Sequence, residues 1–257
     1  MINQQYADDT SWITSSKETK ENIKKEVPKI LKLKNLQVNE GKTEEHTVKR
    51  GGDESWKTCK YLGSFLDTES DIKRRKVLAM NAYNELKYIF ENKKVSLTVK
   101  LRIFKWHIES IFMYNSELWT VTKKLESTID VFQRNILRKI LNIRWPDKIS
   151  NDKLYEKTKE SPWSKTVKKR RLKWYGHLIR LPEETPAKQA LREAQKASRK
   201  PRGGQKLTWL KLVKKDLENV KVKVVVKGGG LKTVEHEEVA KNRQNWQCVI
   251  NSAMSHS

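Results

Sequence analysis

Cysteine is scarce in this sequence, which has only Cys59 and Cys248 in 257 residues. Two thiols are too few for a disulfide framework or a cysteine-rich zinc site. The histidines offer no alternative, because neither the cysteines nor the other histidines are spaced around His177 as zinc ligands would be. We therefore expect no cysteine-rich zinc site, and we expect His177 to be packed or to face a phosphate rather than bind a metal.

Long apolar runs are absent as well. No stretch of about 18 apolar residues occurs, so we expect no transmembrane helix. Residues 1–20 contain Asp8, Asp9 and Glu18 and no apolar segment, which excludes a secretory signal peptide. The sequence predicts a protein of the nucleus or cytoplasm that is not secreted, in a compartment that keeps thiols reduced.

Acidic residues are few relative to basic ones. The sequence has 31 Asp and Glu and 55 Lys and Arg, which give a formal net charge of +24 and a pI near 9.9. Nine tryptophans and 36% hydrophobic residues are enough for packed cores, which excludes full disorder. A folded chain this basic most often binds a polyanion, nucleic acid first and an anionic membrane surface second. We expect RNA or DNA as the partner and no membrane.

The positive charge is concentrated in residues 161–215. This segment holds 17 Lys and Arg against three acids, or +14. Four aromatic residues lie between the cations along the chain: Trp163, Trp174, Tyr175 and Trp209. Cations attract phosphates, and exposed aromatic rings stack on bases. The pattern favours a nucleic-acid-binding segment, and a solvated, lysine-rich helix surface is the alternative.

Several of these cations fall on one predicted helix over residues 163–181. Spacings of three and four place Lys169, Lys173 and Arg180 near one face, with apolar residues on another. We interpret this as a phosphate-binding face over a packed face, and an ordinary amphipathic helix is the alternative. The predicted nucleic-acid-binding cations are Lys168, Lys169, Arg170, Arg171, Lys173 and Arg180, with Arg199, Lys200 and Arg202 in a predicted loop over 198–205.

The periodicity predicts an α+β fold that is mostly α. Small elements come first: a hairpin over 1–16, a helix over 17–37 bent near Pro28, a turn and strand over 38–50, a turn at 51–53, and a strand over 56–66 that ends at a Gly63 bend. Residues 221–230, rich in Lys, Val and Gly, are interpreted as a short edge strand or an insertion.

From residue 71 onward the pattern is helical. Asp71 and Ser96 are the expected N-caps of the first two helices. The inner face of the second is predicted to hold Val99, Ile103, Trp106, His107, Ile111 and Tyr114. Further helices are expected over 123–143, 151–158, 163–181, 186–198, 206–219 and 233–250.

Adjacent carboxylates stand in the first predicted turn, in Tyr6-Ala7-Asp8-Asp9. Hard oxygen ligands of this kind suit Mg²⁺, and two such ions would clamp the oxygens of a phosphoryl transfer. Ordinary turn chemistry is the alternative, because Asp is favoured in turns for its local hydrogen bonds.

The order of several segments is more specific than any one of them. After the Tyr6-Ala7-Asp8-Asp9 box come segments at 38–44, 60–64, 72–75, 114–119, 132–138 and 170–180, then Thr208-Trp209 ahead of Asp216-Leu217, and 237–246. This ordered set resembles the C-terminal half of reverse transcriptases from non-LTR (LINE-type) retrotransposons. The resemblance covers roughly residues 3–219 and resumes after the Lys/Val stretch.

The resemblance implies a role for each matching residue. Asp8 and Asp9 would be catalytic Mg²⁺ ligands of palm motif C, and Lys42 would belong to motif D near the departing pyrophosphate. Tyr61, with Leu62 and Gly63, would belong to the primer grip. The implied domains are a partial palm over 1–67 (hairpin, helix and strands), a helical thumb-like region over 68–145, and a basic helical region over 146–257 that contains the insertion near 221–230.

Other family features have no counterpart in this sequence. The fingers, the upstream palm aspartate and the nucleotide-binding residues are missing, so the two-carboxylate metal site is incomplete. We expect a truncated RNA-directed DNA polymerase that is inactive alone, holds no stable Mg²⁺ and still binds RNA or DNA. Its missing N-terminal half, if expressed elsewhere, would be a further partner. A non-enzymatic nucleic-acid-binding module derived from a retrotransposon is the alternative.

Overall fold

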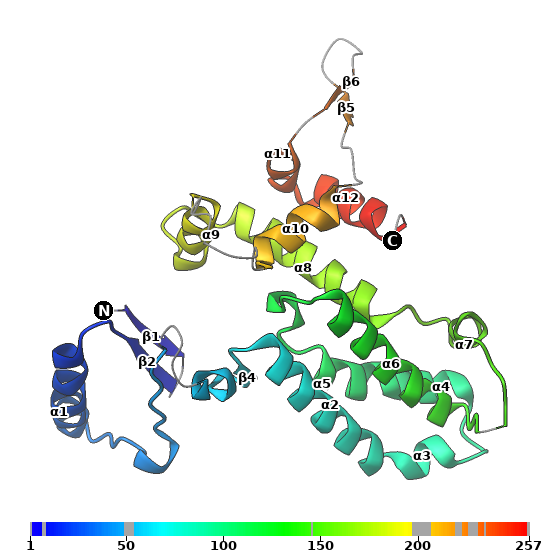
Figure 1. Cartoon of the computed structure of the whole chain (residues 1–257), viewed down its shortest axis with the longest axis horizontal. Helices are drawn as coiled ribbons and strands as arrows, with labels where there is room; N and C mark the ends of the chain where they lie inside the picture. Colours follow the sequence, from blue (N-terminus) through cyan, green and yellow to red (C-terminus); the bar gives the residue numbers. More distant parts are fainter. Residues whose placement is uncertain are drawn as a thin grey trace. The chain divides into compact units, whose positions relative to one another are not determined.

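The computed structural model is mostly helical, with two-stranded antiparallel sheets (Figure 1). It describes residues 2–6, 9–48, 54–144, 146–196, 207–218, 223–225, 231–233 and 235–255. The chain divides into two compact units, Met1–Asp67 and Thr68–Ser257, which are called unit 1 and unit 2 below. The predicted α+β class with a predominance of helix is confirmed.

Unit 1 begins with the predicted hairpin, which is confirmed. Strands β1 (Ile2–Tyr6) and β2 (Asp9–Ile13) pair antiparallel, with Tyr6 opposite Asp9. Helix α1 (Lys17–Leu33) follows, because the Ser16 hydroxyl caps it by accepting a hydrogen bond from the Thr19 N–H. Pro28 lies inside this helix, which ends four residues before the predicted limit.

The rest of unit 1 differs from its prediction. Residues 38–48 contain no strand; η1 (Glu40–Lys42) forms instead, because the Asn39 side chain accepts from the Lys42 N–H. In place of a strand over 56–66 stand η2 (Ser55–Thr58), β3 (Lys60–Tyr61) and β4 (Ser64–Phe65). Positive φ at Leu62 and Gly63 closes this tight hairpin. The predicted turn at 51–53 lies outside the described residues.

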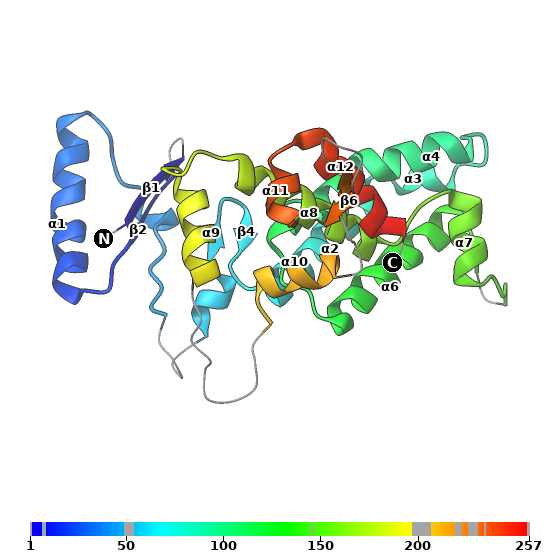
Figure 2. The ribbon, with the colours of Figure 1, turned by 90° about the horizontal axis from the view of Figure 1, so that it is seen from above.

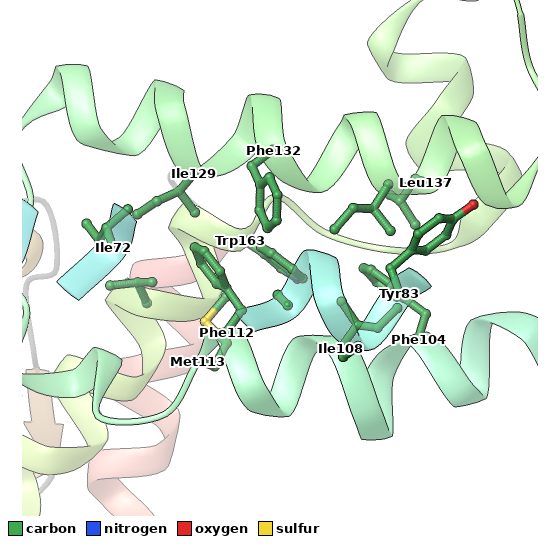
Figure 3. Close-up of a cluster of buried hydrophobic side chains, with 14 of the residues drawn as sticks. Ile72, Tyr83, Phe104, Ile108, Phe112, Met113, Ile129, Phe132, Leu137 and Trp163 are labelled. Carbon is green, nitrogen blue, oxygen red and sulfur yellow. The ribbon is translucent and has the colours of Figure 1, made fainter. Parts of the chain in front are cut away.

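The first core of unit 2 gathers apolar side chains around Trp163 (Figure 3). The Trp163 ring stacks on Phe112 at 4.5 Å between centroids and on Phe104 at 5.6 Å. The elements that form this core are α2 (Thr68–Glu85), α3 (Lys87–Glu91), α4 (Leu97–Ile103), the π-helix η3 (Phe104–Glu109), α5 (Ser110–Phe112), α6 (Lys123–Ile140), α7 (Asn151–Thr158) and the first half of α8 (Trp163–Arg180). The short helix η4 (Ser116–Leu118) stands between α5 and α6 along the chain.

Of the two predicted caps in this region, one is confirmed and one is wrong. The Ser96 hydroxyl accepts from the Val99 N–H, as expected for the N-cap of α4. Asp71 is not a cap, because α2 already begins at Thr68. Its carboxylate is buried and accepts a 2.9 Å hydrogen bond from the Trp119 indole N–H, so tertiary contact takes the place of capping.

The second core lies around the other half of α8 (Figure 2). Helices packed against it are α9 (Pro186–Lys196), α10 (Trp209–Leu217), α11 (His236–Ala240) and α12 (Arg243–Ser255). Gly176 permits this packing: a Cβ there would come within 2.2 Å of Trp246 Nε1. That indole N–H donates to the Leu172 carbonyl at 2.8 Å.

The predicted Lys/Val/Gly segment contributes a strand. β5 (Lys223–Val225) pairs antiparallel with β6 (Leu231–Thr233). Residues 226–230 and the predicted loop over 198–205 lie outside the described residues.

Between the two cores, α8 carries a buried cation. Arg171 is 1% exposed; its Nε donates to Asp216 Oδ2 of α10 at 2.8 Å, and its Nη2 lies 2.8 Å from the same oxygen in an ion pair. Its Nη1 lies 3.4 Å from the Trp119 carbonyl oxygen. The guanidinium therefore joins α8, α10 and the segment that precedes α6.

Replacing Arg171 with methionine should destabilise unit 2 by about 3–5 kcal/mol, because Asp216 is left as an uncompensated, nearly buried charge. The same substitution at exposed Lys169, on the same helix, should change the free energy of unfolding by no more than about 0.5 kcal/mol. Denaturant unfolding followed by tryptophan fluorescence measures both. Equal stability of the two variants would contradict the assignment of Arg171.

Candidate nucleic-acid interface

Nearly all of the net charge belongs to unit 2. Residues 1–67 hold 12 Lys and Arg against 11 Asp and Glu, or +1, whereas residues 68–257 hold 43 against 20, or +23. Any long-range attraction to a polyanion therefore originates in unit 2.

Four of the predicted phosphate-binding cations of α8 are used inside the protein. Lys168 Nζ donates to the Ala253 carbonyl at 3.3 Å, Arg170 Nη1 to that of Met113 at 2.7 Å, and Arg180 Nη1 to that of Ala240 at 2.8 Å. Arg171, the fourth, is buried against Asp216 and has no surface to offer a phosphate, which corrects its prediction. Burial lowers the pKa of the Lys168 ammonium, and the Asp216 carboxylate opposes that shift.

Lys169 and Lys173 are exposed on α8, although Arg180, predicted on the same face, bonds to a backbone carbonyl. They are four residues apart, and exposed His177 continues the same stripe. Neither lysine pairs with a carboxylate among the residues that the structure describes. This solvent-facing stripe of α8 is therefore where a phosphate backbone would meet free ammonium groups.

The aromatic residues predicted to stack on bases are mostly structural. Trp163 is 1% exposed and Tyr175 is 6% exposed, so both belong to cores. Trp209 donates its indole N–H to the Glu117 carbonyl at 2.7 Å, and Trp174 is half-buried beside His177. Base stacking by Trp163 or Tyr175 is excluded, because neither ring face reaches solvent.

A different aromatic residue, Trp106, is largely exposed. It is 72% exposed on η3, and the Arg102 guanidinium lies 5.7 Å from the centre of its ring. Its predicted place on an inner face is wrong, as are those of His107, Val99 and Tyr114, which are exposed as well. The π-helical turn η3 changes the register from 3.6 residues per turn only from Phe104 onward. An exposed indole beside a cation suits a nucleobase.

The remaining predicted site residues are in unit 1 or outside the described residues. Asp9 is exposed at the start of β2, and Lys42 is exposed on η1. Tyr61 is half-buried on β3, and Gly63 has a φ of 79° in the turn that follows. Asp8, Arg199, Lys200 and Arg202 fall outside the described ranges.

A different set of possible ligands does come together. Within the described part of the chain, Asp9 belongs to no group of three metal-ligating side chains. The one such group there consists of Glu44, His46 and Cys59. Spacing along the chain could not find it, because Cys59 is 13 residues beyond His46.

Comparisons of the chain with protein-family models, with curated proteins and with solved structures find no match. The resemblance to reverse transcriptases therefore depends on the sequence segments alone. Across the described residues, none of the helices combines the length and apolarity needed to cross a bilayer.

If Trp106 stacks on a base, Trp106→Ala should weaken binding of single-stranded RNA or DNA by about 1–3 kcal/mol, roughly 5- to 150-fold. Folding should be unchanged, because the side chain is exposed. Tyr88→Ala is the control: Tyr88 is 71% exposed and has no cation-π contact among the described residues. Fluorescence anisotropy with a labelled oligonucleotide measures both, and equal affinities of the two variants would exclude stacking by Trp106.

Proposed function

We propose that this chain is an RNA- or DNA-binding module, related to the C-terminal half of non-LTR retrotransposon reverse transcriptases, that does not catalyse polymerisation by itself. The observation that carries the proposal is the charge of unit 2, +23, together with the exposed lysines of α8 that no described carboxylate neutralises. Such a partner is met in the nucleus or the cytoplasm.

The cations on α8 form two sets, one that contacts the rest of the protein and one that is free to contact phosphates. One set, Lys168, Arg170, Arg171 and Arg180, bonds to carbonyl and carboxylate groups of neighbouring elements. They fix the rotation of α8, which keeps Lys169 and Lys173 directed at solvent. Each lysine that contacts a phosphate releases condensed counterions, so binding gains entropy and depends on salt.

Binding is proposed over catalysis because of the carboxylates. A two-metal phosphoryl transfer needs ligands that clamp both ions, and the motif that resembles the polymerase centre supplies only Asp8 and Asp9. Mg²⁺ dehydrates reluctantly and is held poorly by two carboxylates without further ligands. The chain is therefore proposed to hold nucleic acid without a stably bound Mg²⁺.

The Lys169→Gln/Lys173→Gln double variant should bind nucleic acid more weakly and with less salt dependence. Losing two phosphate contacts should reduce the slope of log K against log salt by about 1.4 to 1.8, since each contact contributes about 0.7 to 0.9. Anisotropy titrations over a salt series measure this slope.

The matched control is Lys25→Gln/Lys32→Gln on α1, which removes the same two charges from exposed positions of unit 1. It should leave both affinity and slope unchanged. An equal loss of affinity in the two double variants would mean that binding depends on net charge and not on a defined surface. Failure of the unaltered chain to bind nucleic acid would refute the proposed function.

The purified 257-residue chain should not extend a primer on an RNA or DNA template with Mg²⁺ and deoxynucleotides. The physical reason is the incomplete ligand set at Asp8 and Asp9. A gel-based extension assay measures product, with Asp8→Asn/Asp9→Asn as the control for contaminating polymerase. Extension that this control abolishes would show that the chain is catalytic.

A further inference from the structure

Three metal-ligating side chains converge in unit 1, apart from the proposed nucleic-acid interface. Glu44, His46 and Cys59 each offer one ligand atom, and these atoms lie within 4.8 Å of one another. His46 and Cys59 are half-buried, and Glu44 is exposed. The three therefore form a partly shielded cluster with one side open to solvent.

The imidazole of His46 has an unsatisfied nitrogen. Its Nε2 lies 3.1 Å from Glu44 Oε2, whereas Nδ1 is buried and has no hydrogen-bond partner among the described residues. Buried polar atoms are normally paired, so an orphan imidazole nitrogen indicates a missing ligand. A cation on Nδ1 would satisfy this nitrogen, and the exposed Glu44 carboxylate would turn from Nε2 to the ion.

Unit 1 also lacks the usual means of holding a small unit together. Among its residues whose burial is described, only Ser64 is buried, and no apolar side chain is. Units of this size that have no hydrophobic core are commonly stabilised by disulfides or a structural metal. Both cysteines of the chain are free thiols, so no disulfide serves here.

The backbone around the cluster is held from two directions. Glu45, between two of the ligands, forms ion pairs with Lys20 and Lys24 of α1. The Cys59 carbonyl accepts from the Leu66 N–H at 3.3 Å, which ties the third ligand to the end of the β3–β4 hairpin. A metal at the cluster would cross-link these two anchored segments.

We propose that Glu44, His46 and Cys59 form a zinc site, completed by water at the fourth position. Thiolate, imidazole and carboxylate together match the donor preferences of zinc, with three protein ligands and one open position. Zinc would displace the proton of the Cys59 thiol, whose pKa is raised by burial and then by the Glu44 carboxylate. The ion would stabilise unit 1 by joining residues 44–46 to Cys59.

The test uses the reduced, metal-free, full-length chain with Co²⁺ as a spectroscopic probe that Zn²⁺ then displaces. We expect one ion per chain, with the absorption of a cobalt–thiolate bond. Cys59→Ser and His46→Ala should each lower affinity by at least about 100-fold, since even outer-shell partners cost about 10- to 100-fold. Cys248→Ser and His107→Ala are matched controls at exposed positions and should bind as the unaltered chain does.

A second readout is proteolysis of unit 1, which Zn²⁺ should slow in the unaltered chain and in Cys248→Ser but not in Cys59→Ser. Absence of saturable binding, or equal losses in Cys59→Ser and Cys248→Ser, would overturn the site. Nucleic-acid binding by the same variants should be unchanged, so failure of the zinc site is distinguishable from failure of the proposed function.

Discussion

The buried guanidinium of Arg171 determines how the larger unit is assembled. An isolated charge in a protein interior is costly, and the cost is offset only when hydrogen bonds and an opposite charge surround it. Asp216 and the Trp119 carbonyl meet this condition, so α10 and the segment before α6 must both lie against α8. The ion pair thereby sets the rotation of the one helix that belongs to both cores.

Segments far apart in the sequence meet around residues 113–119. Arg170 donates to the Met113 carbonyl and Trp209 to that of Glu117, beside the contact of Arg171 with Trp119. The 113–119 segment contains the short helix η4 and the turns around it, and side chains of α8 and α10 donate to its carbonyls. Several residues in the sequence segments that resemble reverse transcriptases therefore have a packing role that no ligand is needed to explain.

The two units contrast in what stabilises them. Unit 2 has two apolar cores and a net charge of +23, which suits a polyanion. Unit 1 is nearly neutral, has no buried apolar side chain among the residues whose burial is described, and gathers three possible metal ligands. We therefore expect nucleic acid to bind unit 2, which has the positive charge, and a metal ion to bind unit 1, whose described residues form no apolar core.

The sequence by itself determined the helical periodicity of unit 2, the first hairpin and the Ser96 cap, because these depend on neighbours along the chain. Only the tertiary structure decided which cations remain free. Lys169 and Arg171 are two residues apart and chemically alike, yet one faces solvent and the other Asp216. Likewise only the folded chain leaves Trp106 exposed and brings Cys59 to His46. These outcomes depend on long-range contacts, which local residue spacing does not encode.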